Sequence, residues 1–252
     1  VARACAASSA VPGLLTPLTL KNYAGSCGFV MPPFIQAPTQ SYRVRAMRET
    51  LSSVMDPEKK KYFHLIDGGV ADNLGLRAIE EFIESAGSAW TTLKFTGREM
   101  VRKVVFIVVN AETKAEPEWD SIEWIPPFSA MLSSYSTIAI VRYNRETMAI
   151  LQESFDRWAQ DIRTGRCPPG QVSTEPGSCG DIEFYLADVR FENLEDKAEA
   201  DYLEKVTTAF RLTGEEVDRL KAAGRKLLFE SDGFRKFLRD LDSGASSKEA
   251  PR

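Results

Sequence analysis

The sequence is short of the residues that many enzymes and nucleic-acid-binding proteins use at their sites. Its 252 residues include one histidine, His64, and four cysteines, and the formal net charge is −4. The acidic balance argues against a nucleic-acid partner, which needs a basic surface. No Cys/His cluster suited to zinc and no Walker A or G-x-G-x-x-G pattern occurs. We therefore expect neither a metal site nor a cofactor.

Long apolar runs are also missing. No stretch of about 18 consecutive apolar residues occurs, so the sequence predicts no transmembrane helix. Residues 1–20 do not have the pattern of a signal peptide, because their Ala/Ser-rich run is weakly apolar and Pro12 and Pro17 interrupt it. The hydrophobic content of 43% is still high enough for one sizeable core.

The most informative segment that is present is residues 62–77. Apolar and aromatic residues lead directly into Asp67, and Gly68, Gly69 and then Asn73 follow. This pattern predicts a buried strand that ends in a carboxylate, a tight turn, and a helix over 74–84 that Asn73 caps. An acid at the carboxyl end of a strand, beside glycines that allow close approach, is typical of a catalytic position. The alternative is a strand-to-helix connection in which Asp67 only caps the turn.

Two blocks of sequence resemble one known family. Residues 67–73, Asp-Gly-Gly-Val-Ala-Asp-Asn, resemble the Asp-Gly-Gly block of the patatin-like phospholipases. Residues 6–17, Ala-Ala-Ser-Ser-Ala-Val-Pro-Gly-Leu-Leu-Thr-Pro, resemble the Ala-Ser-Ser-Ala-(Val/Ile)-Pro segment that lies upstream of that block in the family. The blocks occur in the family's order and cover about the first third of the chain, and the remainder matches only in general type.

The resemblance implies a lipid acyl hydrolase with a Ser–Asp dyad, in which Asp67 matches the acid and the substrate is a lipid or another ester. In that family the serine stands in a G-x-S-x-G elbow, and a glycine-rich loop supplies the oxyanion donors. No such elbow occurs here, since the segments at 25–28 and 177–180 are too short and loop-like. We therefore expect residues 1–242 to be the C-terminal portion of a patatin-like catalytic domain that requires a missing N-terminal segment and is inactive alone. The alternative is a non-catalytic remnant or a lipid-binding subunit that keeps the fold.

Two other roles for this segment are weaker. His64 lies three residues before Asp67 on the predicted strand, so the two side chains point to opposite faces and a Ser–His–Asp relay is not favoured. His64 is instead expected to be a buried or half-buried strand residue. Asp67 and Asp72 are close enough in sequence to approach one cation, but no further acids crowd the segment. Asp72 is expected to support the turn or the N-terminus of the following helix.

The four cysteines bear on location. Cys167 and Cys179 bracket a polar loop rich in proline and glycine, and a disulfide across it would contribute on the order of 3 kcal/mol. The sequence favours this bridge, and with it an exported, oxidising location; the alternative is two free thiols in a cytoplasmic protein. Cys5 is expected to be a small buried residue. The pairing of Cys27 is open.

The rest of the sequence predicts an α/β fold, a layered sheet flanked by helices. A loop over 116–127 carries Trp119 and Trp124, which either contact a lipid interface, giving a peripheral membrane contact, or pack on their own domain. The continuous apolar run 104–110 predicts a strand buried on both faces. Further strands are predicted over 16–20 and 182–189, helices over 3–10, 42–55, 128–162 (interrupted near Tyr135), 213–228 and after Ser231, and a disordered tail over 243–252.

Overall fold

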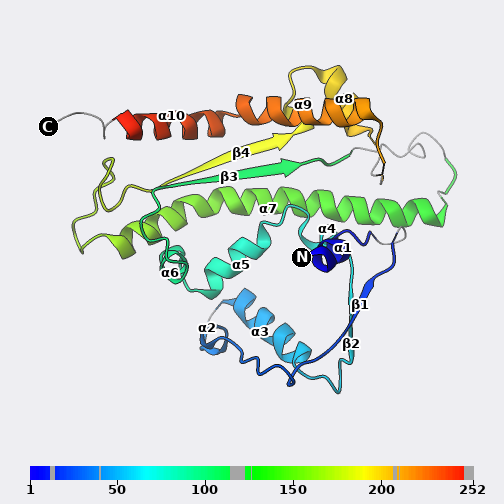
Figure 1. Cartoon of the computed structure of the whole chain (residues 1–252), viewed down its shortest axis with the longest axis horizontal. Helices are drawn as coiled ribbons and strands as arrows, with labels where there is room; N and C mark the ends of the chain where they lie inside the picture. Colours follow the sequence, from blue (N-terminus) through cyan, green and yellow to red (C-terminus); the bar gives the residue numbers. More distant parts are fainter. Residues whose placement is uncertain are drawn as a thin grey trace. The chain divides into compact units, whose positions relative to one another are not determined.

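A computed structural model describes residues 1–11, 15–39, 41–113, 123–125, 127–206, 209 and 211–246. The chain divides into two compact units, one formed by 1–98 and 136–151 and the other by 99–135 and 152–252. The long helix α7 (Phe128–Arg166) contributes residues to both units (Figure 1). The sequence predicts one domain portion over 1–242, since it shows no linker. The boundary between the two units falls inside the continuous helix α7, where no linker could mark it.

The first unit contains two short strands and several helices. Strands β1 (Leu18–Lys21) and β2 (Tyr62–Leu65) pair antiparallel, with Leu18 opposite Leu65. The predicted helices over 3–10 and 42–55 and the strand over 16–20 are confirmed to within two residues at each end. The helices, besides part of α7, are α1 (Ala2–Ser8), α2 (Pro33–Gln36), α3 (Tyr42–Val54), α4 (Gly69–Asp72), α5 (Arg77–Ser85) and α6 (Ala89–Phe95).

The strand that leads to Asp67 is exposed, so the prediction that it is buried is wrong. Leu65 and Ile66 are 38% and 46% exposed. The reason is that, among the described residues, β1 is the only strand paired with β2, and a two-stranded ribbon is too narrow to bury both faces. His64 is exposed as well, contrary to expectation, and its Nδ1 lies 2.9 Å from the Thr19 Oγ1 on β1.

The second unit is built on a parallel pair of strands, β3 (Lys103–Asn110) and β4 (Glu183–Arg190), in register from Lys103–Glu183 to Asn110–Arg190. Residues of α7 cover one face through a cluster of rings with centroids 5.4 to 6.1 Å apart, and α9 (Gly214–Glu230) and α10 (Asp232–Ser246) lie on the other side of β4 (Figure 1). The ring cluster consists of Phe106, Phe155, Trp158 and Phe184. The α/β class is confirmed, with sheets of two strands each among the described residues. The finer prediction of a patatin-like layered sheet stays a prediction.

Strand β3 is less buried than its apolar sequence predicts. Val108 is buried, but Ile107 and Val109 on the opposite face are 46% and 65% exposed. Helices α9 and α10 pack chiefly against β4, so the outer part of this face of β3 is left uncovered. The prediction of a strand buried on both faces is therefore wrong for one face.

Two buried clusters attach the C-terminal helices to β4. An apolar cluster joins the end of β4 to the 3₁₀ helix η2 (Phe191–Asn193), to α8 (Lys197–Glu204) and to α9. Helix α9 begins with the predicted capping box of Thr213 and Glu216. Buried Tyr185 lies within hydrogen-bond distance of Glu183 Oε2 (2.6 Å) and, on α10, Asp240 Oδ2 (2.8 Å). Burial, together with these two carboxylates, raises the pKa of the Tyr185 hydroxyl far above its ordinary value.

Two helix predictions need correction. Helix α7 is continuous through Tyr135, because a Ser/Thr cluster lowers helix propensity by only about 0.5 kcal/mol per residue. Helix α10 extends to Ser246, so the first four residues of the predicted disordered tail are helical; the apolar spacing of Phe234, Phe237 and Leu241 carries the helix into this polar end. Residues 247–252 lie outside the described residues. No helix among the described residues is long and apolar enough to cross a membrane.

Gly233 allows α10 to lie directly on β4, which gives a test of this packing. A Cβ on Gly233 would overlap the carbonyl oxygen of Leu186, whereas a Cβ on Gly224 in α9 would meet nothing within 4 Å. We expect Gly233→Ala to lower the free energy of unfolding by about 1–3 kcal/mol, as overpacking does. The matched control Gly224→Ala should raise it by about 0.5–1 kcal/mol, because alanine favours the helix. Urea unfolding measures both, and equal effects of the two substitutions would contradict the contact.

Candidate functional site

The backbone brings together the two blocks that resemble the patatin-like family. The Asp67 N–H donates to the carbonyl oxygen of Ala10 (3.1 Å), and the Gly68 N–H donates to that of Ser8 (3.4 Å). The end of α1 therefore lies against the turn that follows β2, although the two segments are far apart in the sequence. Pro12, in the first block, lies outside the described residues.

The Asp67 side chain is held by its own turn. Its Oδ1 accepts a hydrogen bond from the Gly69 N–H at 2.6 Å, and the side chain is half-buried. The sequence suggests two reasons for Gly68 and Gly69: a positive φ, or the close approach of another group. Neither residue has a positive φ. Close approach is what they provide. A Cβ on Gly69 would lie 2.9 Å from Asp67 Oδ1, and one on Gly68 would lie 3.1 Å from Ser8 Oγ.

Asn73 does not cap the helix that follows, so that prediction is wrong. Asn73 is the C-cap of the short helix α4, and α5 begins only at Arg77. Gly75, with φ of +68°, turns the chain between the two helices and separates Asn73 from α5. Asp72 takes the role instead: its Oδ2 accepts from the N–H groups of Arg77 (3.0 Å) and Ala78 (3.4 Å), as expected for an acid at a helix N-terminus.

The carboxylate of Asp67 is thus held at a turn by the N–H of Gly69. Acyl transfer through a covalent intermediate also requires a nucleophile and donors for the oxyanion. The structure places one hydroxyl, that of Ser8, next to Gly68, a neighbour that sequence reasoning missed. The signal for it was present in the sequence, since Ser8 belongs to the block that the resemblance had singled out.

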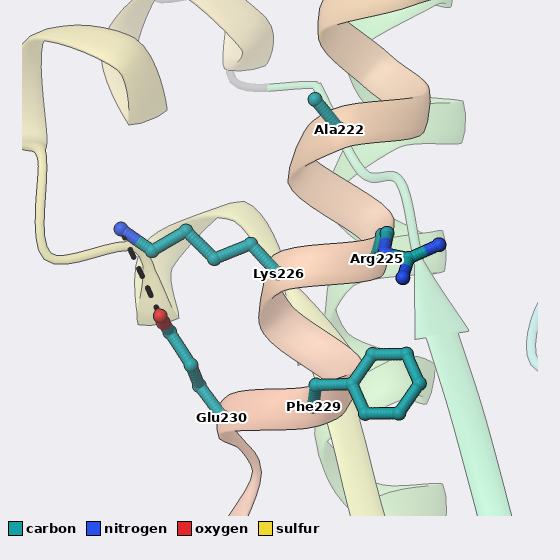
Figure 2. Close-up of a pocket in the computed structure, with 5 residues that line it drawn as sticks. All are labelled: Ala222, Arg225, Lys226, Phe229 and Glu230. Atoms are coloured by element: carbon teal, nitrogen blue, oxygen red, sulfur yellow. Dashed lines mark ion pairs between the residues drawn. The ribbon is translucent and has the colours of Figure 1, made fainter.

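Two pockets lie away from Asp67. One, of about 520 Å³, is lined by residues of α3 and α5, including Arg43, Met47 and Arg77. The other, of about 480 Å³, lies along α9 in the second unit. Figure 2 shows its lining, in which Lys226 Nζ lies 3.9 Å from Glu230 Oε1 and the Arg225 guanidinium lies 5.5 Å from the centroid of the Phe229 ring. Neither pocket contains a residue predicted for the site.

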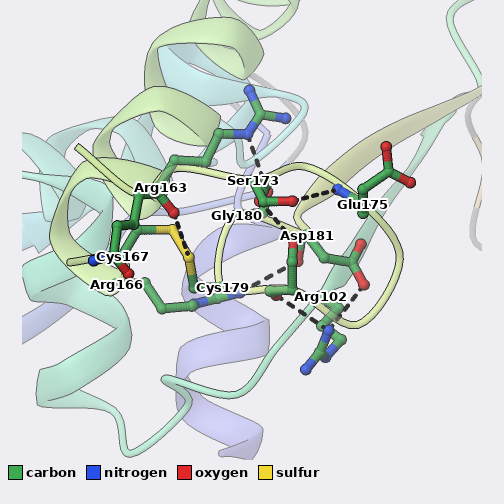
Figure 3. The surroundings of a disulfide bond; sticks show 11 residues. Arg102, Arg163, Arg166, Cys167, Ser173, Glu175, Cys179, Gly180 and Asp181 are labelled. Atoms are coloured by element: carbon green, nitrogen blue, oxygen red, sulfur yellow. Dashed lines mark hydrogen bonds and ion pairs between the residues drawn. A yellow bond between two sulfur atoms is a disulfide. The ribbon is translucent and has the colours of Figure 1, made fainter. Parts of the chain in front are cut away.

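Cys167 and Cys179 form a disulfide, the pairing that the sequence favours, with 5.1 Å between their Cα atoms (Figure 3). Cys5 and Cys27 are free and exposed. The expectation that Cys5 is buried is wrong, because α1 buries only Ala7.

Three arginines hold the loop that the disulfide closes (Figure 3). Arg163 donates to the carbonyl oxygens of Gly180 and Ile182, each at 3.1 Å, and Arg166 donates to that of Val101 at 2.6 Å. Arg102 forms an ion pair of 2.9 Å with Asp181. Burial of Asp181 opposes its ionisation, but the N–H of Gly177 and the Arg102 guanidinium outweigh this effect and hold the pKa of the carboxyl below its ordinary value.

No protein-family model, no curated protein and no solved structure matches the chain. The resemblance of its two blocks to the patatin-like phospholipases therefore stays a prediction.

The disulfide is tested by a thiol count. We expect two free thiols, those of Cys5 and Cys27, in protein purified from its native source, denatured without reductant and titrated with a thiol reagent. Reduction before the titration should raise the count to the four cysteines of the sequence. Four reactive thiols without reductant would contradict the disulfide.

Proposed function

We propose that this chain supplies the catalytic acid, Asp67, of a lipid acyl hydrolase that resembles the patatin-like phospholipases. The observation that carries the proposal is the backbone pairing of residues 8–10 with residues 67–68, since it joins the two segments of the resemblance at one turn. A half-buried carboxylate held by the Gly69 N–H is suited to take the proton of a serine hydroxyl.

In the proposed reaction, Asp67 removes the proton of a serine hydroxyl as the serine oxygen attacks the ester carbonyl. The tetrahedral intermediate expels the alcohol, which receives that proton, and water then hydrolyses the acyl-serine with Asp67 again as the base. The 252 residues contain no G-x-S-x-G elbow. The nucleophile and the oxyanion donors are therefore proposed to come from a polypeptide segment outside residues 1–252.

A serine-directed fluorophosphonate probe and an ester substrate test this proposal together. We expect neither labelling nor turnover with residues 1–252 alone. The longest polypeptide encoded in frame with these residues should show both. Asp67→Asn in that polypeptide should lower turnover by about 10²–10⁴-fold, the contribution typical of a general base. Asparagine keeps an oxygen that accepts from the Gly69 N–H, so this variant should retain the turn.

Two results would overturn the proposal. Absence of labelling and turnover in the longer polypeptide, with phospholipid and simple esters as substrates, would leave the non-catalytic alternative, a lipid-binding subunit. Turnover by residues 1–252 that Asp67→Asn abolishes would show that the nucleophile lies within the chain. Ser8→Ala would then be the first variant to make, because the Ser8 hydroxyl lies beside Gly68.

A contact with a lipid surface is a second proposal, and the exposure of Trp124 and Ile125 favours it. These side chains are 84% and 85% exposed. A tryptophan and an isoleucine so exposed are suited to the boundary between headgroups and acyl chains. Trp119 of the same predicted loop lies outside the described residues.

Vesicle co-sedimentation tests this contact. We expect Trp124→Ser with Ile125→Ser to weaken binding to phospholipid vesicles by about 10-fold or more, since each buried apolar side chain contributes about 1.5–3 kcal/mol. Phe95→Ser, which removes another side chain that is 71% exposed, is the control and should leave binding unchanged. Equal binding of the wild type and the double variant would remove the proposal.

We also propose an exported location, which the disulfide supports. Disulfides persist in oxidising compartments and are rare in the cytoplasm, so the bond between Cys167 and Cys179 supports export. The thiol count on natively sourced protein also tests this location, because four free thiols would favour the cytoplasm.

A further inference from the structure

The pocket between α3 and α5 combines an apolar wall with charged side chains. Its volume of about 520 Å³ lies within the range of small-molecule sites, about 300–1,000 Å³. The apolar wall consists of Ala46, Met47 and Leu51, all on α3. Both helices belong to the first unit, so the pocket lies within one compact body.

The two charged side chains that α5 contributes have no ionic partner. Arg43 on α3 lies 3.6 Å from Glu84, which offsets its charge. By contrast, the Arg77 guanidinium and the Glu81 carboxylate form no ion pair or hydrogen bond with each other or with any other residue that the structure describes. Arg77 precedes Glu81 by four residues, and a helical pair with the cation first is less favourable than the reverse order. The pocket therefore presents one positive and one negative charge to a ligand.

Arg77 is held in place without the use of its N–H donors. Its guanidinium lies 5.2 Å from the centroid of the Tyr143 ring, on the part of α7 that belongs to the same unit. The N–H groups therefore stay available to an oxyanion, which a guanidinium binds strongly. Glu81 lies one turn further along α5, and residues with this spacing have Cβ atoms about 5–6 Å apart. One small molecule is long enough to reach both charges.

We propose that this pocket binds a zwitterionic phosphocholine or phosphoethanolamine group, with its phosphate at Arg77 and its ammonium at Glu81. The two charges of such a group are separated by a short carbon bridge, which suits the separation of Arg77 from Glu81. An anion alone would meet the Glu81 carboxylate, and a cation alone would meet the Arg77 guanidinium. The apolar wall on α3 suits the carbon bridge and the methyl groups of choline.

Calorimetric titration with glycerophosphocholine tests the site. We expect saturable binding to the 252-residue chain. Arg77→Gln and Glu81→Gln should each weaken this binding by about 10-fold or more, because each removes a charged hydrogen-bonding group. The matched control is Glu49→Gln, which makes the same change at an exposed position of α3 outside the pocket and should leave binding unchanged. Circular dichroism checks that each variant is folded.

Glycerol phosphate, which lacks the ammonium, separates a zwitterion site from a general anion site. Glu81→Gln should strengthen the binding of this anion, because a like charge is removed, while it weakens the binding of glycerophosphocholine. A change in the same direction for both compounds would overturn the proposal. Two other results would also overturn it: no saturable binding of glycerophosphocholine, or loss of that binding in the longer in-frame polypeptide, whose added segment would then fill the pocket.

Phosphatidylcholine vesicles distinguish the two sources of such a group, a free molecule and a lipid headgroup. If the source is a headgroup, vesicles should bind the wild type more tightly than Arg77→Gln or Glu81→Gln. If it is a free molecule, vesicles should not distinguish the wild type from these variants, while glycerophosphocholine still does. These measurements need no turnover and involve no change at Asp67, so their failure and the failure of the proposed hydrolase function are separate results.

Discussion

The candidate site around Asp67 depends on a pair of backbone hydrogen bonds. The N–H groups of Asp67 and Gly68 donate to the carbonyl oxygens of Ala10 and Ser8, so two segments more than fifty residues apart share one turn. The turn can form because residues 68 and 69 lack side chains, which leaves room for the Ser8 hydroxyl and the Asp67 carboxylate. Without this arrangement, Asp67 would follow a short, exposed ribbon with little to fix its direction.

The second unit depends on a different constraint, the burial of a parallel strand pair by helices from both ends of its sequence. Aromatic rings of α7 pack on one face, while Tyr185 and the cluster around Leu203 and Leu227 attach the C-terminal helices to β4. Parallel pairs are normally covered on both faces. The face that carries Ile107 and Val109 departs from this rule, because α9 and α10 pack chiefly against β4.

The sequence predicts the local elements better than their surroundings. The spacing of apolar residues and the helix-capping residues locate α3, α9 and β4 to within about two residues, because these signals lie within the segment itself. Burial depends on partners elsewhere in the chain, so β2, Cys5 and one face of β3 were expected to be buried and are not. Asn73 failed as a cap for a similar reason: Gly75 interrupts the helix pattern, and the carboxylate of Asp72 reaches the N-terminus of α5 instead.

The arginine contacts around the closed loop have a consequence for the chemistry of its sulfur atoms. Arg163 binds the carbonyl oxygens of Gly180 and Ile182, just before β4, and Arg166 binds that of Asp181 between them. The segment that carries Cys179 is therefore held near the end of α7 by bonds that do not involve sulfur. After reduction, these contacts keep the two thiols neighbours at a high effective concentration. We therefore expect reoxidation to rejoin Cys167 with Cys179.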